Sequence, residues 1–144
     1  MTAHDAIRSL MNTYCKAIDQ GDLKTFGHLF RHARWLVEGL SPGPESEGNV
    51  RIYEDGTPRT KHVITNVQID VDTTSGTATG HSYVTVYQQT QDDPLRVIFV
   101  GEYFDEFAQV DGHWRFKQRD IRHPLFGDLS THLKNPQATF SQAP

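Results

Sequence analysis

The hydrophobic pattern at the start of the chain predicts two helices that form a hairpin. In the opening segment, apolar residues recur three or four positions apart, as they do on one face of an α-helix. This face comprises Ile7, Leu10, Met11, Tyr14, Ala17 and Ile18. Thr2 and Asp5 are spaced as a capping pair at its start, and Gly21 can take the left-handed conformation that ends it. Asp22 can then cap a second helix, whose apolar residues are Leu23, Phe26, Leu29 and Phe30.

Most of the remaining chain follows patterns typical of β-strands. Residues 34–38 predict a short strand, and residues 61–71 alternate from one face to the other as a long strand does. One face of the long strand would carry Val63, Thr65, Val67, Ile69 and Val71, and the other His62, Ile64, Asn66, Gln68 and Asp70. Further strands are predicted at 77–89, 95–108 and 113–122.

The segments between these elements are rich in turn-forming residues. The Asp-Gly pair at 111–112 is typical of a tight hairpin turn between the last two strands. Residues 41–44 break the chain before an ambiguous stretch, 45–53, that can form a short helix, and residues 54–58 predict a turn. The part after Asn135 is polar and contains proline, so we expect it to be loosely held.

Two helices followed by a meander of long strands predict an α+β fold. In such a fold the sheet curls around the apolar face of the helices. A chain of 144 residues fits a single domain, 1–144, and can bury roughly two-thirds of the surface that its unfolded form exposes. The sequence contains no repeat or linker that would indicate a second domain.

Composition and charge argue against several classes of partner. The chain has 14 basic and 18 acidic side chains, a formal charge of −4, and no basic stripe that would bind nucleic acid. Its apolar runs are far shorter than the roughly 18 residues of a membrane span. The single cysteine, Cys15, cannot form an internal disulfide, and the amino terminus lacks the basic and apolar regions of a signal peptide. We therefore expect a cytoplasmic protein.

Asp19 and His62 are the strongest candidates for chemistry. Asp19 ends the first predicted helix, and His62 begins the long strand. A carboxylate beside an imidazole fixes the tautomer of the ring and raises its basicity, so the couple can move a proton near neutral pH. Taken separately, Asp19 is typical of a surface carboxylate at a helix end, and His62 is typical of a histidine hydrogen-bonded into the core. If the two side chains meet in a closed pocket, they predict a proton-transfer site.

Four segments give the chain a family resemblance over roughly residues 5–133. They are Tyr14 to Asp22, Thr57 to Asn66, Gly101 to Asp105 and Val110 to Phe116. Together they resemble the SnoaL-like members of the nuclear transport factor 2-like (NTF2-like) superfamily. These are small cone-shaped α+β domains that include scytalone dehydratase, hexachlorocyclohexane dehydrochlorinase and ketosteroid isomerases. The resemblance implies N-terminal helices packed on a strongly curved, mostly antiparallel sheet.

The resemblance also implies site residues. In the dehydratase and dehydrochlorinase branch, an aspartate at a helix end pairs with a strand histidine that acts as catalytic base, and Asp19 and His62 stand at the matching positions. The same branch usually has a basic or aromatic polar residue about one turn before the aspartate, an aromatic residue in the first strand and an arginine in the last strand. Tyr14, Trp35 and Arg119 are the nearest counterparts.

The function that this resemblance implies is a cofactor-independent lyase, of dehydratase or dehydrohalogenase type, or an isomerase. Its substrate would be a small, cyclic, hydrophobic molecule. The superfamily also includes β subunits of ring-hydroxylating dioxygenases, so a non-catalytic module for ligand binding or subunit assembly is the alternative. Relatives pair or form trimers through the convex side of the sheet, so we expect a homodimer or homotrimer. The apolar residues expected on that side are Val63, Val67 and Ile69.

Further candidates for substrate binding lie on the predicted strands. Asn66 can bind a substrate oxygen or satisfy a backbone group, and the Tyr83 hydroxyl can polarise a carbonyl or simply belong to a half-buried strand face. Tyr103 is suited to a cavity wall, although aromatic strand residues are usually core residues. Arg119 can contact substrate only if a bulge turns it inward.

The sequence gives little support for a metal or nucleotide cofactor. His28 and His32 have the spacing of zinc ligands on a helix, but no glutamate lies between them as a general base and no third ligand is evident. Cys15 is most simply a small buried apolar residue. The chain also lacks glycine-rich phosphate-binding motifs, so we expect no cofactor.

Overall fold

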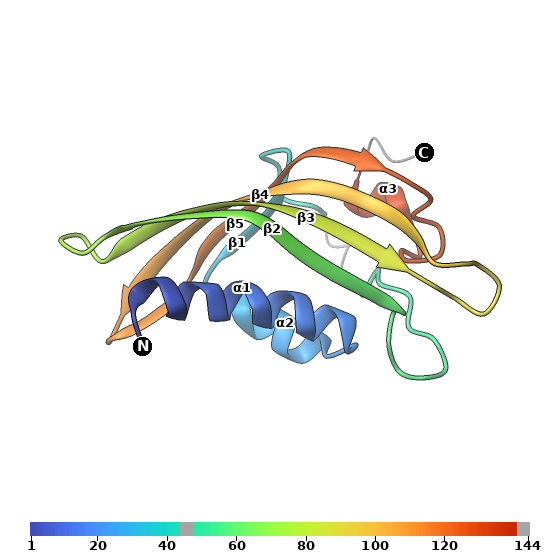
Figure 1. Ribbon diagram of the computed structural model, residues 1–144, viewed down its shortest axis with the longest axis horizontal. Coiled ribbons are helices and arrows are strands. Elements are labelled where there is room, and N and C mark those ends of the chain that lie inside the picture. Colours follow the sequence, from blue (N-terminus) through green and yellow to red (C-terminus); the bar gives the residue numbers. More distant parts are fainter. Residues whose placement is uncertain (44–47, 141–144) are drawn as a thin grey trace.

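The computed structural model describes residues 1–43 and 48–140 and has the expected α+β architecture, with helices packed on one curved sheet (Figure 1). The helices are α1 (Ala3–Asp19), α2 (Leu23–Leu29) and α3 (Pro136–Thr139). The strands are β1 (Arg34–Val37), β2 (Thr60–Asp72), β3 (Thr77–Gln88), β4 (Arg96–Val110) and β5 (His113–Phe126). Among these residues, no helix is long and apolar enough to cross a membrane.

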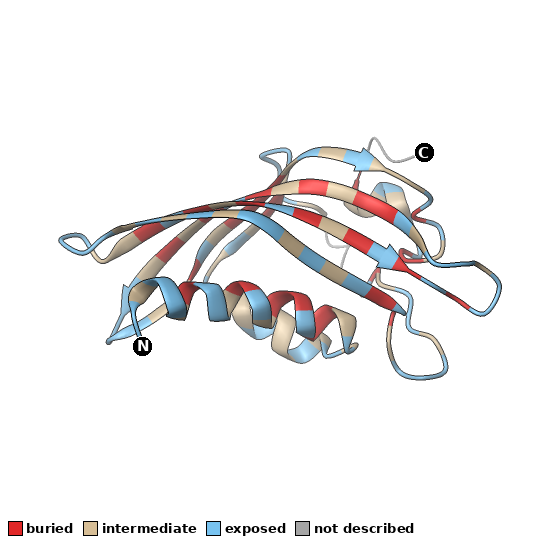
Figure 2. Ribbon diagram, in the orientation of Figure 1, coloured by how far each residue is buried: buried red, intermediate tan, exposed pale blue. Residues whose placement is uncertain are grey.

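The five strands form one mixed sheet in the order β1-β5-β4-β3-β2. Strands β2 to β5 are an antiparallel meander, and β1 joins its far side parallel to β5. The sheet arches over α1 and α2, which cover its concave face (Figure 1). Buried and exposed residues alternate along the strands, most regularly in β3, as expected where one face meets a core and the other meets solvent (Figure 2).

The helix boundaries follow the predicted capping residues. Thr2 accepts a hydrogen bond from the backbone N–H of Asp5, and Asp22 accepts one from the backbone N–H of Thr25. Gly21 has a φ of +74°, and a Cβ atom there would lie 2.1 Å from the carbonyl oxygen of Gly56. Only glycine fits this contact. The close approach fixes the end of α1 against the turn before β2, and so sets Asp19 beside the start of that strand.

A β-bulge interrupts β2 and corrects the predicted faces of this strand. The pairing with β3 shifts between Thr65 and Gln68, and Asn66 has a φ of +55°. The extra residue moves the inward side from even to odd positions, a change that simple alternation cannot reveal. The inward residues are His62 and Ile64 before the bulge, and Val67, Ile69 and Val71 after it. The prediction of one unbroken alternation over 61–71 was therefore wrong, as was the convex position of Val67 and Ile69.

A second bulge, in β5, turns Arg119 toward the core. Phe107 pairs with Phe116, whereas the preceding Glu106 pairs with Gln118, so β5 contains one extra residue at Lys117. This is the bulge that an inward position of Arg119 requires. The β4–β5 hairpin itself turns at residues 111–112, both with positive φ, as the Asp-Gly pair predicted.

The described part of the C-terminal segment runs to residue 140 and includes a short helix. Strand β5 continues to Phe126, and Asn135 then caps the short helix α3. Phe140, which is 9% exposed, packs against Phe99 with 5.1 Å between ring centroids. Phe140 therefore packs the end of this segment against the core.

The segment before β2 pairs with this C-terminal region. Of the stretch 45–53, where a short helix was considered, residues 45–47 lie outside the described residues, and 48–53 form no helix. Instead Val50 forms a β-bridge with Leu133. The Asn49 amide donates hydrogen bonds to the Asn135 carbonyl (2.7 Å) and to the Thr139 hydroxyl (2.9 Å). Two loops that are distant in sequence thus close one end of the core.

Candidate functional site

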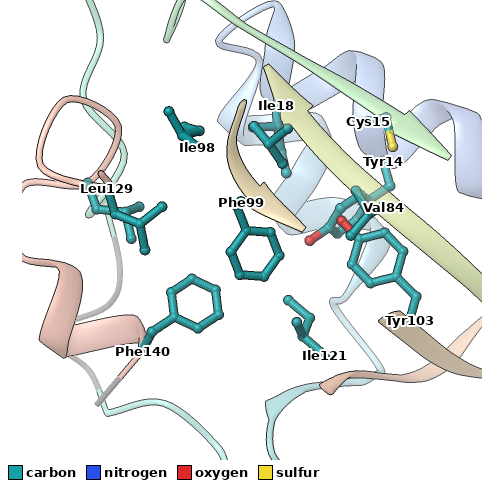
Figure 3. Packing of buried hydrophobic residues seen from close by; sticks show 12 residues of the cluster. Tyr14, Cys15, Ile18, Val84, Ile98, Phe99, Tyr103, Ile121, Leu129 and Phe140 are labelled. Atoms are coloured by element: carbon teal, nitrogen blue, oxygen red, sulfur yellow. The ribbon is translucent and has the colours of Figure 1, made fainter. Parts of the chain in front are cut away.

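A cavity of about 420 Å³ lies between the first two helices and the concave side of the sheet. Its walls are mostly aliphatic and aromatic, and Figure 3 shows Phe99 and Phe140 beside each other in this core. The paired loops described above form its end wall. The lining residues include Tyr14, Ile18, Phe26, Trp35, His62, Val86, Phe99, Tyr103, Ile121, Leu129, His132 and Phe140. Size and lining suit a small, mostly apolar ring compound.

The structure brings Asp19 and His62 together at the side of this cavity. The Asp19 Oδ1 atom lies 2.6 Å from Nδ1 of His62, and the side chains are only 11% and 7% exposed. The Asp19 carboxylate also accepts hydrogen bonds from the backbone N–H of His62 and from the Thr60 hydroxyl, both at 2.8 Å. Three donors therefore surround one carboxylate.

The local chain geometry explains why these donors converge. Arg59 precedes them with a φ of +61°, an unfavourable conformation for a residue other than glycine. Beside it, Pro58 is buried, and its carbonyl accepts a hydrogen bond from the Gln88 amide at 3.0 Å. This turn directs the Thr60 hydroxyl and the His62 backbone N–H to the end of α1, where Asp19 is held.

The electrostatics of the pair favour an ionised carboxylate. Burial raises the pKa of Asp19, but the hydrogen bonds and charge interaction with His62, together with the Thr60 hydrogen bond, outweigh it and leave the pKa below its ordinary value. An ionised carboxylate accepts hydrogen bonds only, so Nδ1 of His62 carries the proton. In the neutral form of this ring, Nε2 keeps its lone pair, as a general base requires.

Tyr14, Trp35 and Tyr103 form a polar patch in the wall of the cavity. The Trp35 Nε1–H donates to the Tyr14 hydroxyl at 3.1 Å, and the rings of Tyr14 and Tyr103 lie 5.6 Å apart with their hydroxyls turned toward each other (Figure 3). Burial raises the pKa of both tyrosines, so both are protonated at neutral pH. All three residues line the cavity, where the sequence predicted substrate contacts.

Arg119 lies behind this patch and does not line the cavity. Its side chain is fully buried and donates two hydrogen bonds to Asp105, at 2.7 and 2.8 Å. The guanidinium carbon is 4.2 Å from the ring centre of Tyr14 and 3.7 Å from that of Tyr103. Burial lowers the pKa of Arg119, but the charge of Asp105 outweighs this and raises it above its ordinary value. Arg119 thus supports the two tyrosines instead of contacting a substrate directly.

His132 is a lining residue that sequence reasoning missed. It is 9% exposed, and its ring centroid lies 6.1 Å from that of His62. Burial, and then the positive charge that His62 carries when it is protonated, lower the pKa of His132 to about 3, so the ring of His132 is neutral at neutral pH. The residue lies in a loop, where no periodic pattern marks an inward position. The only signal was its place between the apolar residues Leu129 and Leu133.

Comparison with known proteins identifies the family to which this chain belongs. The profile of the SnoaL-like domain matches residues 1–120. The chain belongs to the SnoaL-like domain family. A comparison with curated proteins finds no match.

Solved structures similar to this SnoaL-like chain share its NTF2-like fold. A candidate scytalone dehydratase from Novosphingobium aromaticivorans is 22% identical, with a TM-score of 0.63 and 87% of each chain covered. LinA is 19% identical, with a TM-score of 0.61, 87% of this chain and 89% of that chain covered. The β subunit of a candidate aromatic-ring-hydroxylating dioxygenase from Novosphingobium aromaticivorans is 18% identical, with a TM-score of 0.66, 91% of this chain and 95% of that chain covered. At these identities the likeness establishes the fold alone.

Two candidates predicted from sequence lie away from the cavity of this SnoaL-like chain. Asn66 is exposed at the bulge of β2, where it takes a left-handed conformation that asparagine tolerates better than most residues. Tyr83 is 43% exposed on the convex face of the sheet, because the inward positions of β3 are the even-numbered ones. Neither side chain can contact a molecule held beside His62.

Metal and thiol chemistry have little support among the described residues of the SnoaL-like chain. Within 1–43 and 48–140, no three His, Cys, Asp or Glu side chains lie together so as to hold a metal ion. Helix α2 ends at Leu29, so His28 and His32 do not share a helical face, and both are exposed. Burial raises the pKa of the Cys15 thiol to about 12, which keeps it protonated and unreactive.

Proposed function

We propose that the chain is a cofactor-independent lyase or isomerase that removes a proton from carbon in a small, cyclic, mostly apolar molecule. The observation that carries this proposal is the 2.6 Å contact between Asp19 and Nδ1 of His62 beside an aromatic cavity. This contact leaves Nε2 of His62 as the basic atom on the cavity side. A paired histidine in an apolar hollow is well suited to general base catalysis.

In the proposed reaction, Nε2 of His62 takes the proton and the carboxylate of Asp19 stabilises the resulting imidazolium. In an elimination, the electrons of the broken C–H bond form a double bond, the bond from the neighbouring carbon to oxygen or halogen breaks, and hydroxide or halide leaves with the electron pair of that bond. The imidazolium can return its proton to a leaving hydroxide, which departs as water. In an isomerisation, the electrons delocalise onto an adjacent carbonyl, and the proton returns to another carbon. The Tyr14 hydroxyl is suited to assist either outcome by hydrogen bonding.

A second candidate function is a non-catalytic module for ligand binding or subunit assembly. The structural likeness to the β subunit of a candidate aromatic-ring-hydroxylating dioxygenase favours this function, because a β subunit is one part of a larger enzyme. The two hypotheses differ in what they require of the paired side chains. A binding module needs the cavity, but it does not need an ionised Asp19 held against His62.

The test is turnover by variants of the pair. A screen of hydroxylated and halogenated ring compounds would supply the substrate, and Asp19→Asn and His62→Ala would each reduce kcat by about 10²–10⁴-fold, the usual contribution of a general base. His28→Ala is the matched control, because His28 is exposed on α2 outside the cavity and its loss should leave turnover unchanged. Circular dichroism would check that each variant melts as the parent does. Normal turnover by well-folded Asp19 and His62 variants would reject the catalytic proposal.

We also propose that the protein works in the cytoplasm. A buried, unpaired thiol such as Cys15 is ordinary in a reducing compartment, where disulfides are rare. Fractionation of the source cells would test this location.

A further inference from the structure

The cavity contains a second imidazole that the proposed proton transfer does not use. His132 follows β5, and its ring lines the same cavity as the ring of His62. The two ring centroids lie 6.1 Å apart, and the planes are inclined at 62°. A small molecule held against His62 is therefore also within reach of His132.

The burial of His132 indicates which ring nitrogen carries its proton. Nδ1 is buried and has no hydrogen-bond partner in the part of the chain that the structure describes. Unpaired buried N–H groups are rarer in proteins than unpaired buried acceptors, because they are more costly. The proton of the neutral ring therefore belongs on Nε2. Because His132 lines the cavity, Nε2 is the nitrogen available to a ligand there.

The two histidines thus offer complementary groups to one ligand. His62 presents a lone pair because its Nδ1–H faces Asp19, whereas His132 presents an N–H donor. When a carbon next to a carbonyl loses its proton, negative charge appears on the oxygen two bonds away. A donor already aimed at that oxygen lowers the barrier, and a neutral imidazole can serve because it keeps its own proton.

We propose that His132 binds the substrate oxygen on which negative charge develops. It follows that the preferred substrates are apolar rings with a hydroxyl or carbonyl group beside the carbon that loses its proton, whereas rings that carry only halogens are poorer ligands. The proposal rests on the proposed function for the reaction, but the binding of an oxygen by His132 does not depend on turnover and can be measured without it.

Two ligands of nearly equal size test the oxygen site directly. 2-Naphthol carries a hydroxyl where 2-methylnaphthalene carries a methyl group, and both are flat rings suited to the aromatic walls. The parent protein should bind 2-naphthol on the order of tenfold more tightly, the effect of one hydrogen bond in a buried site. His132→Leu should abolish this preference, whereas His132→Gln, which keeps an N–H donor, should retain most of it. Fluorescence titration gives both dissociation constants for each protein.

The affinity for 2-methylnaphthalene serves as the control for an intact cavity. If the leucine variant binds this ligand poorly, its cavity has changed. The preference for 2-naphthol is then compared between the parent and His132→Gln. A parent that does not prefer 2-naphthol, or a preference that survives in the leucine variant, would overturn the proposal. Failure of the proposed function gives a different result, in which the Asp19 and His62 variants turn over normally while the preference for 2-naphthol still depends on His132.

Discussion

The Arg119 guanidinium has no exposure to solvent, and neither has the Asp105 carboxylate that accepts its two hydrogen bonds. Two charges removed from water attract each other strongly, but each depends on the other for compensation. Their position beneath Tyr14 and Tyr103 links the stability of the core to the wall of the cavity. At the scale of single residues, burial therefore decides which charged side chains contribute most to the stability of this protein.

Removing one member of this buried pair should be strongly destabilising. Asp105→Ala leaves the Arg119 charge without a partner, and we expect a loss of about 3–5 kcal/mol in the free energy of unfolding. Asp93→Ala is the control, because the half-exposed pair of Asp93 and Arg96, 3.7 Å apart, should contribute less than about 1 kcal/mol. Urea denaturation measures both. Equal losses in the two variants would contradict the importance of burial.

His132 should make the protein sensitive to mild acid. Its pKa is about 3 in the folded protein and about 6.5 when unfolded, so between these values the unfolded chain binds more protons. Stability is then fully present above about pH 6.5 and falls as the pH is lowered, by up to about 1.4 kcal/mol per pH unit. His132→Gln lacks this dependence. Urea denaturation of both proteins between pH 7 and 4 tests the point, and parallel curves for the two proteins would refute it.

The sequence could predict residues whose positions follow from element ends. Asp19 and His62 were placed by a capped helix and by the start of a strand, and the family resemblance supplied the pairing. Asn66 and Tyr83 were misplaced because strand faces depend on bulges and on the direction of curvature, which alternation does not encode. His132 was missed for a related reason, since a loop residue acquires its surroundings only from contacts distant in sequence.

At the scale of elements, the site depends on how α1 meets the start of β2. The helix ends at Asp19, and Gly21 then passes against the carbonyl oxygen of Gly56 in the turn before the strand. The N-terminal helices, their caps and most strand limits followed from local sequence, since they depend on neighbouring residues. The bulges at Asn66 and Lys117 did not follow from local sequence, although an inward position of Arg119 was expected to require a bulge.

A methyl group at Gly21 should push the end of α1 away from the turn before β2. Gly21→Ala would place a Cβ 2.1 Å from the Gly56 carbonyl oxygen and strain a positive φ, so we expect a loss of on the order of 1–3 kcal/mol and reduced turnover. Gly27→Ala is the control, because no atom lies within 4 Å of its added Cβ and alanine favours helix α2. Thermal melting compares the two variants. A neutral Gly21 variant would show that the contact does not hold the helix end.

At the scale of the whole molecule, the convex side of the sheet carries exposed apolar side chains. The strand register sets Val63, Val100 and Leu125 in one row across β2, β4 and β5, through Thr85 on β3. Tyr83, Tyr87 and Phe104 are also partly exposed. The fold class was predictable at this scale, because two amphipathic helices and a meander have few ways to bury their apolar faces.

We expect this face to join copies of the chain into a dimer or trimer. Sedimentation velocity should show one such assembly, and a double variant, Val63→Lys with Leu125→Lys, should shift it toward monomer because burial of two charges is unfavourable. Leu40→Lys is the control, since Leu40 is highly exposed in the loop after β1. A parent protein that stays monomeric at high concentration would contradict the expectation.

The clamp that Asn49 makes with Asn135 and Thr139 has an evolutionary consequence. It joins two surface loops into the end wall, whereas Asp19 and His62 are held by the end of α1 and the start of β2. Insertions or deletions in those loops would alter the length of molecule that the cavity accepts without moving this pair. Divergence in the loops could thus change which ligand is bound while the pair is inherited unchanged.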